Sequence, residues 1–288
     1  MASPDLDRAA RFIDLNARLI DRRRFAFLFG DGDAGALIEA LRPYRNPDGG
    51  FGNALEADLR APDSAPQAVA LAFDVLDEAG SFDDPLVAAA CDWLATVATP
   101  DGGVPFVLEP ALAHPHAPWW QPGPEGVGSM LVTPMLAAQL HKHGVEHPWL
   151  EGATEMVWRG IGELDFTSPY TARAVFAFLD HVPDRDRAEA TMAEIGPRVL
   201  ESGVVATDPD ATGEVHTPLD FAPEPGRLSR APFDDSLVER HLDALAAAQR
   251  DDGGWMFNWT SWAPLVELEW RGSLTVHALR VLRDHGRL

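Results

Sequence analysis

The stretch NPDGGF at residues 46–51 decides the fold, because its core returns as TPDGGV at 99–104 and as RDDGGW at 250–255. Gly49 and Gly102 are 53 residues apart, and the 151 residues between Gly102 and Gly253 leave room for roughly three more such steps. Weaker copies stand at Gly152 and Gly203. A repeat of this length is typical of a helical hairpin that stacks on its neighbours. The Gly residues supply positive φ angles, so we predict structural roles for all three turns.

Helices are predicted between these turns from apolar periodicity, N-terminal proline or polar residues, and C-terminal glycine. The segment 65–79 is apolar on more than one side, which indicates a deeply buried helix, whereas 234–249 has one apolar face. Pro209, Pro218, Pro223 and Pro225 exclude a continuous helix over 204–232. The predicted helices are 5–23, 34–44, 65–79, 85–98, 129–143, 149–163, 169–181, 186–201, 234–249 and 270–285.

Length and composition favour one helical domain over residues 1–288. The chain is 46% hydrophobic, enough for a substantial core, and no linker interrupts it. No apolar run follows the N-terminus, so we expect no signal peptide or membrane span and a cytoplasmic location. The single cysteine, Cys91, lies among alanines and is expected to be buried.

The formal charge is −22, from 45 acidic against 23 basic residues. Because nucleic-acid binding needs clustered cations, we expect no nucleic-acid partner. The same acidity disfavours a polyanionic substrate unless a metal ion mediates its binding.

The last repeat reads QRDDGGW over 249–255, which matches the Gln-x-x-x-Gly-x-Trp repeat, and residues 45–51 are a degraded copy with Arg45 and Phe51 at the Gln and Trp positions. The chain therefore resembles the prenyltransferase/squalene-oxidase repeat superfamily, which includes squalene–hopene cyclases and protein-prenyltransferase β-subunits. The resemblance covers most of the chain and is closer to small one-domain members. It implies an all-α fold, an α/α toroid of about five to six helical hairpins with long loops at one end.

The chemical motifs of these relatives are incomplete in this chain. Class II cyclases protonate an alkene with the middle Asp of Asp-x-Asp-Asp; the nearest string is DPDA at 208–211, where Asp210 would be the donor and a simple turn is the alternative. For a class I magnesium motif, Asp235 and Glu239 share a helix face, and helix capping by Asp234 is the alternative. Cys91 lacks the acid that precedes the zinc-binding Cys of prenyltransferases.

Residues at comparable offsets after the glycine turns are expected to converge, since every repeat runs in the same sense and long ordered loops tend to carry function. Acids buried among aromatic residues would have a raised pKa and could stay protonated, as alkene protonation requires. The predicted catalytic acids are Asp58, Asp210, Asp220, Glu267 and Glu269. The predicted substrate contacts are Glu56, Arg60, His114, His116, Trp119, Trp120, Trp259, Trp262 and Arg271.

The segment HPHAPWW at 114–120 is the most distinctive of these loops. Proline excludes helix, so His114 and His116 can point the same way and bind a metal or shuttle a proton. Anchoring of the loop by its proline and tryptophan residues is the alternative. The sequence offers no complete ligand set for Mg²⁺ or Zn²⁺, so no cofactor is predicted.

Nine Trp and fourteen Phe residues suit an apolar substrate and could stabilise a carbocation by cation–π attraction, although most belong to any helical core. The first hypothesis is a class II terpenoid-cyclase-like enzyme, an isomerase or lyase, acting on an isoprenoid-type small molecule through a buried carboxylic acid. The alternatives are a non-catalytic toroid that binds small molecules or proteins, and a metal-assisted hydrolase or lyase using His114 and His116.

Overall fold

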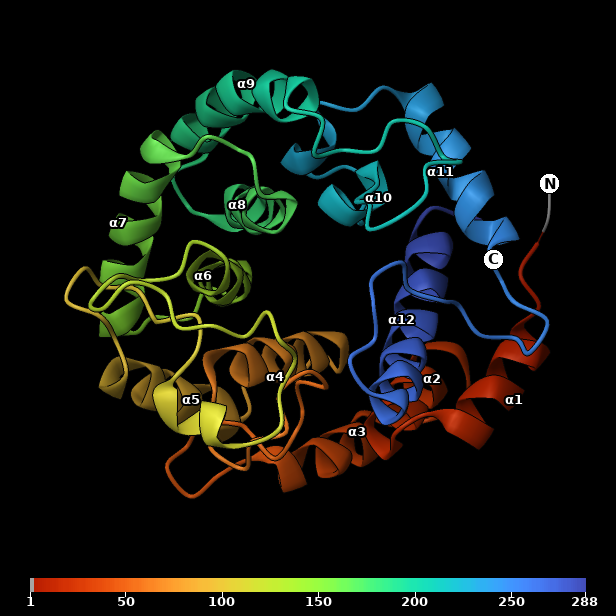
Figure 1. Cartoon of the computed structure of the whole chain (residues 1–288), viewed down its shortest axis with the longest axis horizontal. Helices are drawn as coiled ribbons and strands as arrows, with labels where there is room; N and C mark the ends of the chain where they lie inside the picture. The colour runs from red at the N-terminus through yellow and green to blue at the C-terminus, as the bar shows by residue number, and fades with distance from the viewer. Residues whose placement is uncertain (1–2) are drawn as a thin grey trace. The chain divides into compact units, whose positions relative to one another are not determined.

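The computed structural model describes residues 3–288, and within them the regular structure is helical, with no β-strand (Figure 1). Three short 3-10 helices, η1 (Arg42–Tyr44), η2 (Glu109–Ala113) and η3 (Leu228–Arg230), accompany the α-helices. These are α1 (Leu6–Asn16), α2 (Leu19–Phe29), α3 (Ala34–Leu41), α4 (Pro66–Glu78), α5 (Pro85–Thr96), α6 (Val132–Lys142), α7 (Pro148–Glu163), α8 (Pro169–His181), α9 (Arg185–Glu201), α10 (Pro218–Phe221), α11 (Asp235–Ala247) and α12 (Pro264–Asp284).

The chain divides into two compact units. Unit 1 combines the chain up to Asp31 with Phe166–Asp180 and Asp184–Leu288, and unit 2 consists of Gly32–Asp165 with His181–Pro183. In unit 1, α12 packs against α1, α2 and α11; in unit 2, α4 packs against α3, α5 and α6, and α7 packs against α5 and α6. Within the described residues, every helix is too short or too polar to serve as a membrane span.

The three Asp-Gly-Gly turns share one conformation. Gly49, Gly102 and Gly253 have φ angles of 96°, 98° and 96°, which confirms the predicted positive φ. In each turn the Asp carboxylate accepts a hydrogen bond from the second glycine N–H, at 2.9 to 3.2 Å. Each first glycine lies against the backbone of a further helix, respectively α5, α7 and α1, where a Cβ would collide with a carbonyl oxygen. The three turns therefore have a structural role, because each packs against a further helix.

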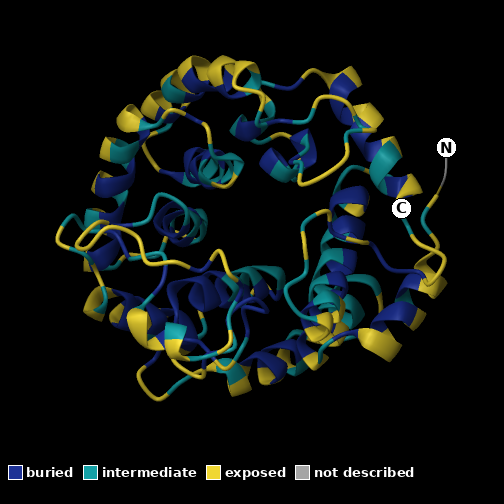
Figure 2. Ribbon diagram, viewed as in Figure 1, coloured by how far each residue is buried: buried dark blue, intermediate teal, exposed yellow. Residues whose placement is uncertain are grey.

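Most predicted helices are present, with ends displaced by a few residues. Helix α4 is buried along most of its length, as predicted for 65–79, and α11 has the predicted single buried face. Figure 2 shows exposed and buried stretches alternating along α9 and α11. The segment 204–232 forms no continuous helix and contains α10 and η3. Cys91 is buried, as predicted, and burial raises the pKa of its thiol to about 12.

Three predictions about elements were wrong. The range 5–23 is not one helix: the chain is extended at Ala17 and Arg18, and α2 starts afresh at Leu19. This break lies against α12, where a Cβ on Gly272 would come within 2.8 Å of Ala17 Cβ. Helix α12 begins at Pro264 and not at residue 270. Gly152 is not a turn but a position within α7, against which Gly102 packs.

Candidate functional site

Two of the loops predicted to converge do so in unit 2. The loop that follows the first Asp-Gly-Gly turn pairs with the loop of residues 104–131 through an antiparallel bridge between Leu59 and His116. The Arg60 N–H donates to the Pro115 carbonyl at 2.9 Å, and the Ala117 N–H donates to the Asp58 carbonyl at 2.9 Å. Backbone pairing therefore places the Glu56–Arg60 segment directly beside the histidine and tryptophan segment. We call this arrangement the paired-loop site.

The backbone entering the paired-loop site is strained. Asn53 and Ala54 both adopt left-handed conformations, with φ angles of 54° and 60°. Alanine pays a steric cost in this region because its Cβ approaches the following carbonyl. Gly52, just before them, lies so close to the backbone of Asp63 that a Cβ would come within 2.1 Å of its carbonyl oxygen. Such strain persists only where the surroundings fix it, and it is concentrated at functional sites.

Two carboxyl-bearing residues of this site are buried. Glu56 is 8% exposed and Asp58 is 5% exposed. A Glu56 carboxyl oxygen accepts a hydrogen bond from the Asp58 backbone N–H at 3.0 Å, which folds the glutamate side chain back over its own loop. Arg60 is intermediate in burial. Buried acids are costly unless they are hydrogen-bonded or protonated, so their presence needs a reason beyond solubility.

Of the two histidines of the paired-loop site, His116 contacts its own loop and His114 contacts the loop that follows the first Asp-Gly-Gly turn. His116 Nδ1 lies 2.7 Å from the His114 carbonyl oxygen, which can only accept, so Nδ1 carries the proton. His114 Nε2 lies 3.5 Å from an Asp63 carboxyl oxygen. Between residues 3 and 288 no three His, Cys, Asp or Glu side chains form a group that could hold a metal ion.

The tryptophans of the same loop differ in exposure. Trp120 is buried and stacks on Phe106, with ring centroids 5.1 Å apart and an interplanar angle of 20°. Trp119 is 46% exposed. Trp120 is therefore packed into the loop, while Trp119 remains accessible to a ligand.

In unit 1, the predicted acids of the 204–232 segment have other roles. Asp210 is exposed, and its N–H donates to the Asp208 carboxylate at 3.0 Å, the arrangement of a simple turn. The Asp220 carboxylate caps α10 by accepting from the Thr217 N–H at 2.7 Å and from its hydroxyl at 2.9 Å. Burial raises the pKa of Asp220, but the charge of Arg173 and the Thr217 hydrogen bonds outweigh burial and hold it below its usual value. An ionised Asp220 does not suit the predicted role of proton donor.

The predicted residues near the start of α12 lie on its first turns or on the loop before it. Glu269 is buried, and Glu267 is intermediate. Trp259 packs edge-on against Trp270, with centroids 5.5 Å apart, and Trp262 is half-buried. These side chains form an aromatic and acidic group at the N-terminal end of the helix.

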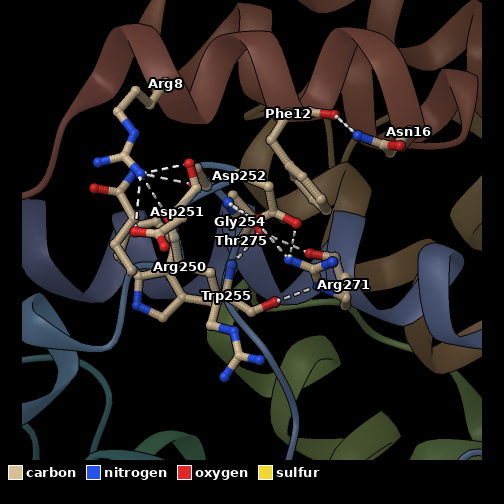
Figure 3. Close-up of polar contacts among 12 residues, drawn as sticks. Arg8, Phe12, Asn16, Arg250, Asp251, Asp252, Gly254, Trp255, Arg271 and Thr275 are labelled. Atoms are coloured by element: carbon tan, nitrogen blue, oxygen red, sulfur yellow. Dashed lines mark hydrogen bonds and ion pairs between the residues drawn. The ribbon is translucent and has the colours of Figure 1, made fainter.

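Arg271, predicted to contact substrate, is engaged by the third Asp-Gly-Gly turn (Figure 3). Its Nη2 donates to both oxygens of Asp252, at 2.8 and 2.7 Å, and its Nε donates to the Trp255 carbonyl at 3.2 Å. The guanidinium also lies over the Phe12 ring of α1, 4.5 Å from its centroid. These contacts account for the buried Arg271 as a structural residue.

Polar residues that the sequence did not single out as a group meet between α8, α10 and α12. Arg173 of α8 donates from Nε to the Asp220 carbonyl at 3.0 Å and contacts His216 Nδ1 at 3.1 Å. Burial and then the positive charge of Arg280 lower the pKa of His277 on α12 to about 4. Arg173 and His216 are 43 residues apart, and no local pattern marks their contact.

One further acid of unit 1 was missed. Burial raises the pKa of Asp180 on α8, although one of its carboxyl oxygens accepts from the Ser229 N–H at 2.7 Å. That contact joins the end of α8 to η3. The sequence did contain one indication of this buried acid, because Asp180 lies on a largely apolar helix.

Comparisons with known proteins bear on the fold. A protein from Actinoplanes has a similar structure, with a TM-score of 0.60 and 16% identity over 93% of this chain and 89% of that one. A variant of the type II terpene cyclase MstE from Scytonema, solved with its substrate geranylgeranyl dihydroxybenzoate, has a TM-score of 0.55 and 13% identity, covering 97% of this chain and 88% of that one. No family model and no curated protein sequence matches. The likeness confirms the predicted fold class, an all-α fold of the terpene-cyclase-like α/α-toroid type.

Proposed function

We propose that this chain is a class II terpenoid-cyclase-like enzyme that protonates an apolar isoprenoid-type molecule with Asp58 of the paired-loop site. The observation that carries the proposal is a buried Asp58, beside a buried Glu56, in a strained loop of a terpene-cyclase-like fold. A carboxyl group withdrawn from water holds its proton more readily, because desolvation disfavours the charged form.

The reaction needs no oxidant or cofactor. The Asp58 carboxyl proton is transferred to one carbon of a terminal C=C bond, and the neighbouring carbon becomes a carbocation. The next C=C bond attacks that carbon and closes a ring. Loss of a proton from the cyclised cation gives an isomer of the substrate, and solvent reprotonates Asp58. The electron-rich faces of the Phe106–Trp120 stack would stabilise positive charge near this loop.

The experiment is incubation with linear isoprenoids in D₂O, followed by mass spectrometry of the products. The probes are geranylgeraniol and geranylgeranyl dihydroxybenzoate, the latter because the similar Scytonema cyclase takes it as substrate. Protonation by an acid that exchanges with solvent predicts a cyclic isomer carrying one deuterium at the protonated carbon. Ionisation of an allylic leaving group, the class I route, would introduce none at that position.

Variants separate the candidate acids. We expect Asp58→Asn to lower turnover by a factor on the order of 10³, the scale of losing the proton donor of a general-acid step. Asp210→Asn, in the exposed turn, is the matched control and is expected to leave turnover unchanged. Glu269→Gln tests the buried acid of α12. Full activity of Asp58→Asn would overturn the assignment of the donor.

A non-catalytic small-molecule binding module is the second candidate. The ionised state favoured at Asp220 and the absence of an Asp-x-Asp-Asp string support it. Saturable binding of geranylgeraniol, with no deuterated isomer at any pH, is the result expected of such a module.

A further inference from the structure

The contact between Arg173 and His216 fixes where the histidine carries its proton. A guanidinium has donors and no acceptor, so the 3.1 Å contact between Arg173 Nη1 and His216 Nδ1 requires Nδ1 to accept. Burial and the positive charge of Arg173 lower the pKa of His216, which keeps the imidazole neutral. A neutral imidazole that accepts at Nδ1 carries its single proton on Nε2. The tautomer of His216 is therefore determined by its neighbour.

The resulting donor has no acceptor within residues 3–288. His216 is 8% exposed, and its Nε2 is buried without a hydrogen-bond partner. Buried N–H groups are nearly always paired, because an unpaired donor loses its hydration without compensation. An Nε2–H in this position is a specific place for an oxygen acceptor.

Arg173 adds a positive charge at the same place. Its Nε is used by the Asp220 carbonyl and its Nη1 by His216, which leaves Nη2 without a hydrogen bond to the described residues. His277 of α12 lies close enough to feel the charges of both Arg173 and Asp220. Helix α8 and the segment that leads into α10 thus bring together a guanidinium and an imidazole N–H that both donate.

We propose that Arg173 and His216 bind the carboxylate of a small organic acid, with the His216 Nε2–H and the Arg173 guanidinium donating to its oxygens. Asp220 lies beside Arg173, and the exposed Glu214 accepts from the Tyr170 hydroxyl at 2.5 Å. These two acids, in a chain of formal charge −22, repel a diphosphate more strongly than a singly charged carboxylate, because the repulsion grows with the charge of the ligand.

Tyr170 lies against the His216 imidazole of this site. Its ring packs edge-on against the His216 ring, with centroids 4.6 Å apart, and the tyrosine is itself 39% exposed. Rotation of this one exposed side chain, with loss of its Glu214 hydrogen bond, would uncover the imidazole. We therefore expect Tyr170→Ala to increase affinity for the carboxylate.

The experiment measures binding of farnesoate, farnesol and inorganic diphosphate to the full chain by calorimetry. A charge-assisted hydrogen bond to a carboxylate predicts that farnesoate binds about tenfold or more tightly than the uncharged farnesol. Arg173→Gln is expected to abolish that preference. Arg198→Gln, which removes an arginine of α9 lying over the Phe166 ring, is the matched control and is expected to keep it.

His216 is tested by a pair of substitutions and by NMR of the wild-type protein. His216→Phe is expected to weaken farnesoate binding, and His216→Gln to restore part of it, because the glutamine amide can place a donor near Nε2. In ¹⁵N spectra, wild-type His216 is expected to show a protonated Nε2 and an unprotonated Nδ1, and the Nε2 signal is expected to shift when farnesoate is added. This measurement does not depend on the folding of any variant.

The proposal is overturned by equal binding of farnesoate and farnesol, by absence of farnesoate binding, or by tighter binding of diphosphate. An Nδ1-protonated His216 would overturn it as well. None of these results depends on whether Asp58 catalyses cyclisation.

Discussion

Two glycines of unit 1 have nearly the same backbone conformation in very different surroundings. Gly253 has φ of 96° and a Cβ there would lie 2.1 Å from the Arg8 carbonyl oxygen, whereas Gly213 has φ of 92° with nothing within 4 Å. We expect Gly213→Ala to cost about 1 kcal/mol for the left-handed conformation alone. Gly253→Ala should cost roughly 2 kcal/mol more, because α1 must also move. Urea unfolding followed by circular dichroism measures both, and equal losses would contradict the docking of this turn on α1.

The Arg271–Asp252 pair predicts a pH-dependent contribution to stability. Burial raises the pKa of Asp252, but the Arg271 and Gly254 hydrogen bonds outweigh it and leave the pKa lowered from 3.8. A lowered folded-state pKa stabilises the fold above the unfolded-state pKa, and this stabilisation is lost as the pH falls through the folded-state value. Because Asp252 is half exposed, the expected size is about 1 kcal/mol.

Arg271→Met tests this pair. The stability difference between wild type and variant should be largest near neutral pH and should shrink well below pH 3.8. Part of the difference should remain at low pH, since the packing over Phe12 and the bond to the Trp255 carbonyl do not titrate. Thermal unfolding at a series of pH values supplies the measurement. A difference that is constant across the series would show that the ion pair contributes nothing.

The site could be predicted from the sequence where the residues lie on consecutive repeats. Glu56, Asp58 and His116 come together in unit 2 as expected, since equivalent loops of neighbouring hairpins meet. The structural role of Arg271 could not be predicted from the sequence. Its partner is Asp252, and the Asp252 carboxylate already accepts a hydrogen bond from the Gly254 N–H within the turn, so the sequence does not indicate a second donor. The Arg173–His216 contact depends on how the irregular segment 204–232 folds back, which local periodicity does not encode.

At the scale of the elements, a buried carboxylate lies just after the break between α1 and α2 in unit 1. Asp21 is fully buried and pairs with Arg18 at 3.1 Å and with Arg24 at 3.0 Å. Arg24 also donates to Ser273 of α12 at 3.1 Å. Arg24 therefore connects the buried Asp21 to α12.

Asp21→Asn should destabilise the protein by about 3 kcal/mol, because it leaves two largely buried guanidinium groups without their carboxylate. Asp7→Asn is the control, since Asp7 lies in the first turn of α1 and is exposed. It should change the free energy of unfolding by less than about 0.5 kcal/mol. Chemical denaturation of both variants gives the comparison. Similar small effects of the two substitutions would show that the Asp21 ion pairs do not stabilise the junction of α1 and α2.

Of the two helix boundaries that were predicted wrongly, one has a signal in the sequence and the other has none. Pro264 is the first residue of α12, and proline at such a position is a helix-start signal that could have placed the boundary correctly. The break at Ala17 and Arg18 has neither glycine nor proline. Its cause is packing against Gly272, 255 positions along the chain from Ala17, and only the folded unit contains that information.

At the scale of the whole molecule, the repeat of Asp-Gly-Gly turns was enough to predict an all-α toroid fold, because three turns with the same core indicate repeated helical units. The division into units is less visible in the sequence. Unit 1 combines the two ends of the chain, and its N-terminal segment contributes Phe12, Ile13 and Ala17 to a buried cluster with Val276 of α12. Unit 2 is nearly continuous.

This connectivity predicts that residues 166–288 do not fold stably without residues 1–31. Their separation exposes the face of α12 that packs on α1 and α2 and removes Phe12, whose burial alone contributes about 2 kcal/mol. We expect the isolated 166–288 fragment to unfold without cooperativity, and addition of a 1–31 peptide to restore helical signal and a cooperative transition. A peptide carrying Phe12→Ala is the matched control and should restore much less, since it leaves a cavity beneath Arg271 and Gly254. Cooperative unfolding of the 166–288 fragment alone, unchanged by either peptide, would mean that α12 needs no N-terminal partner.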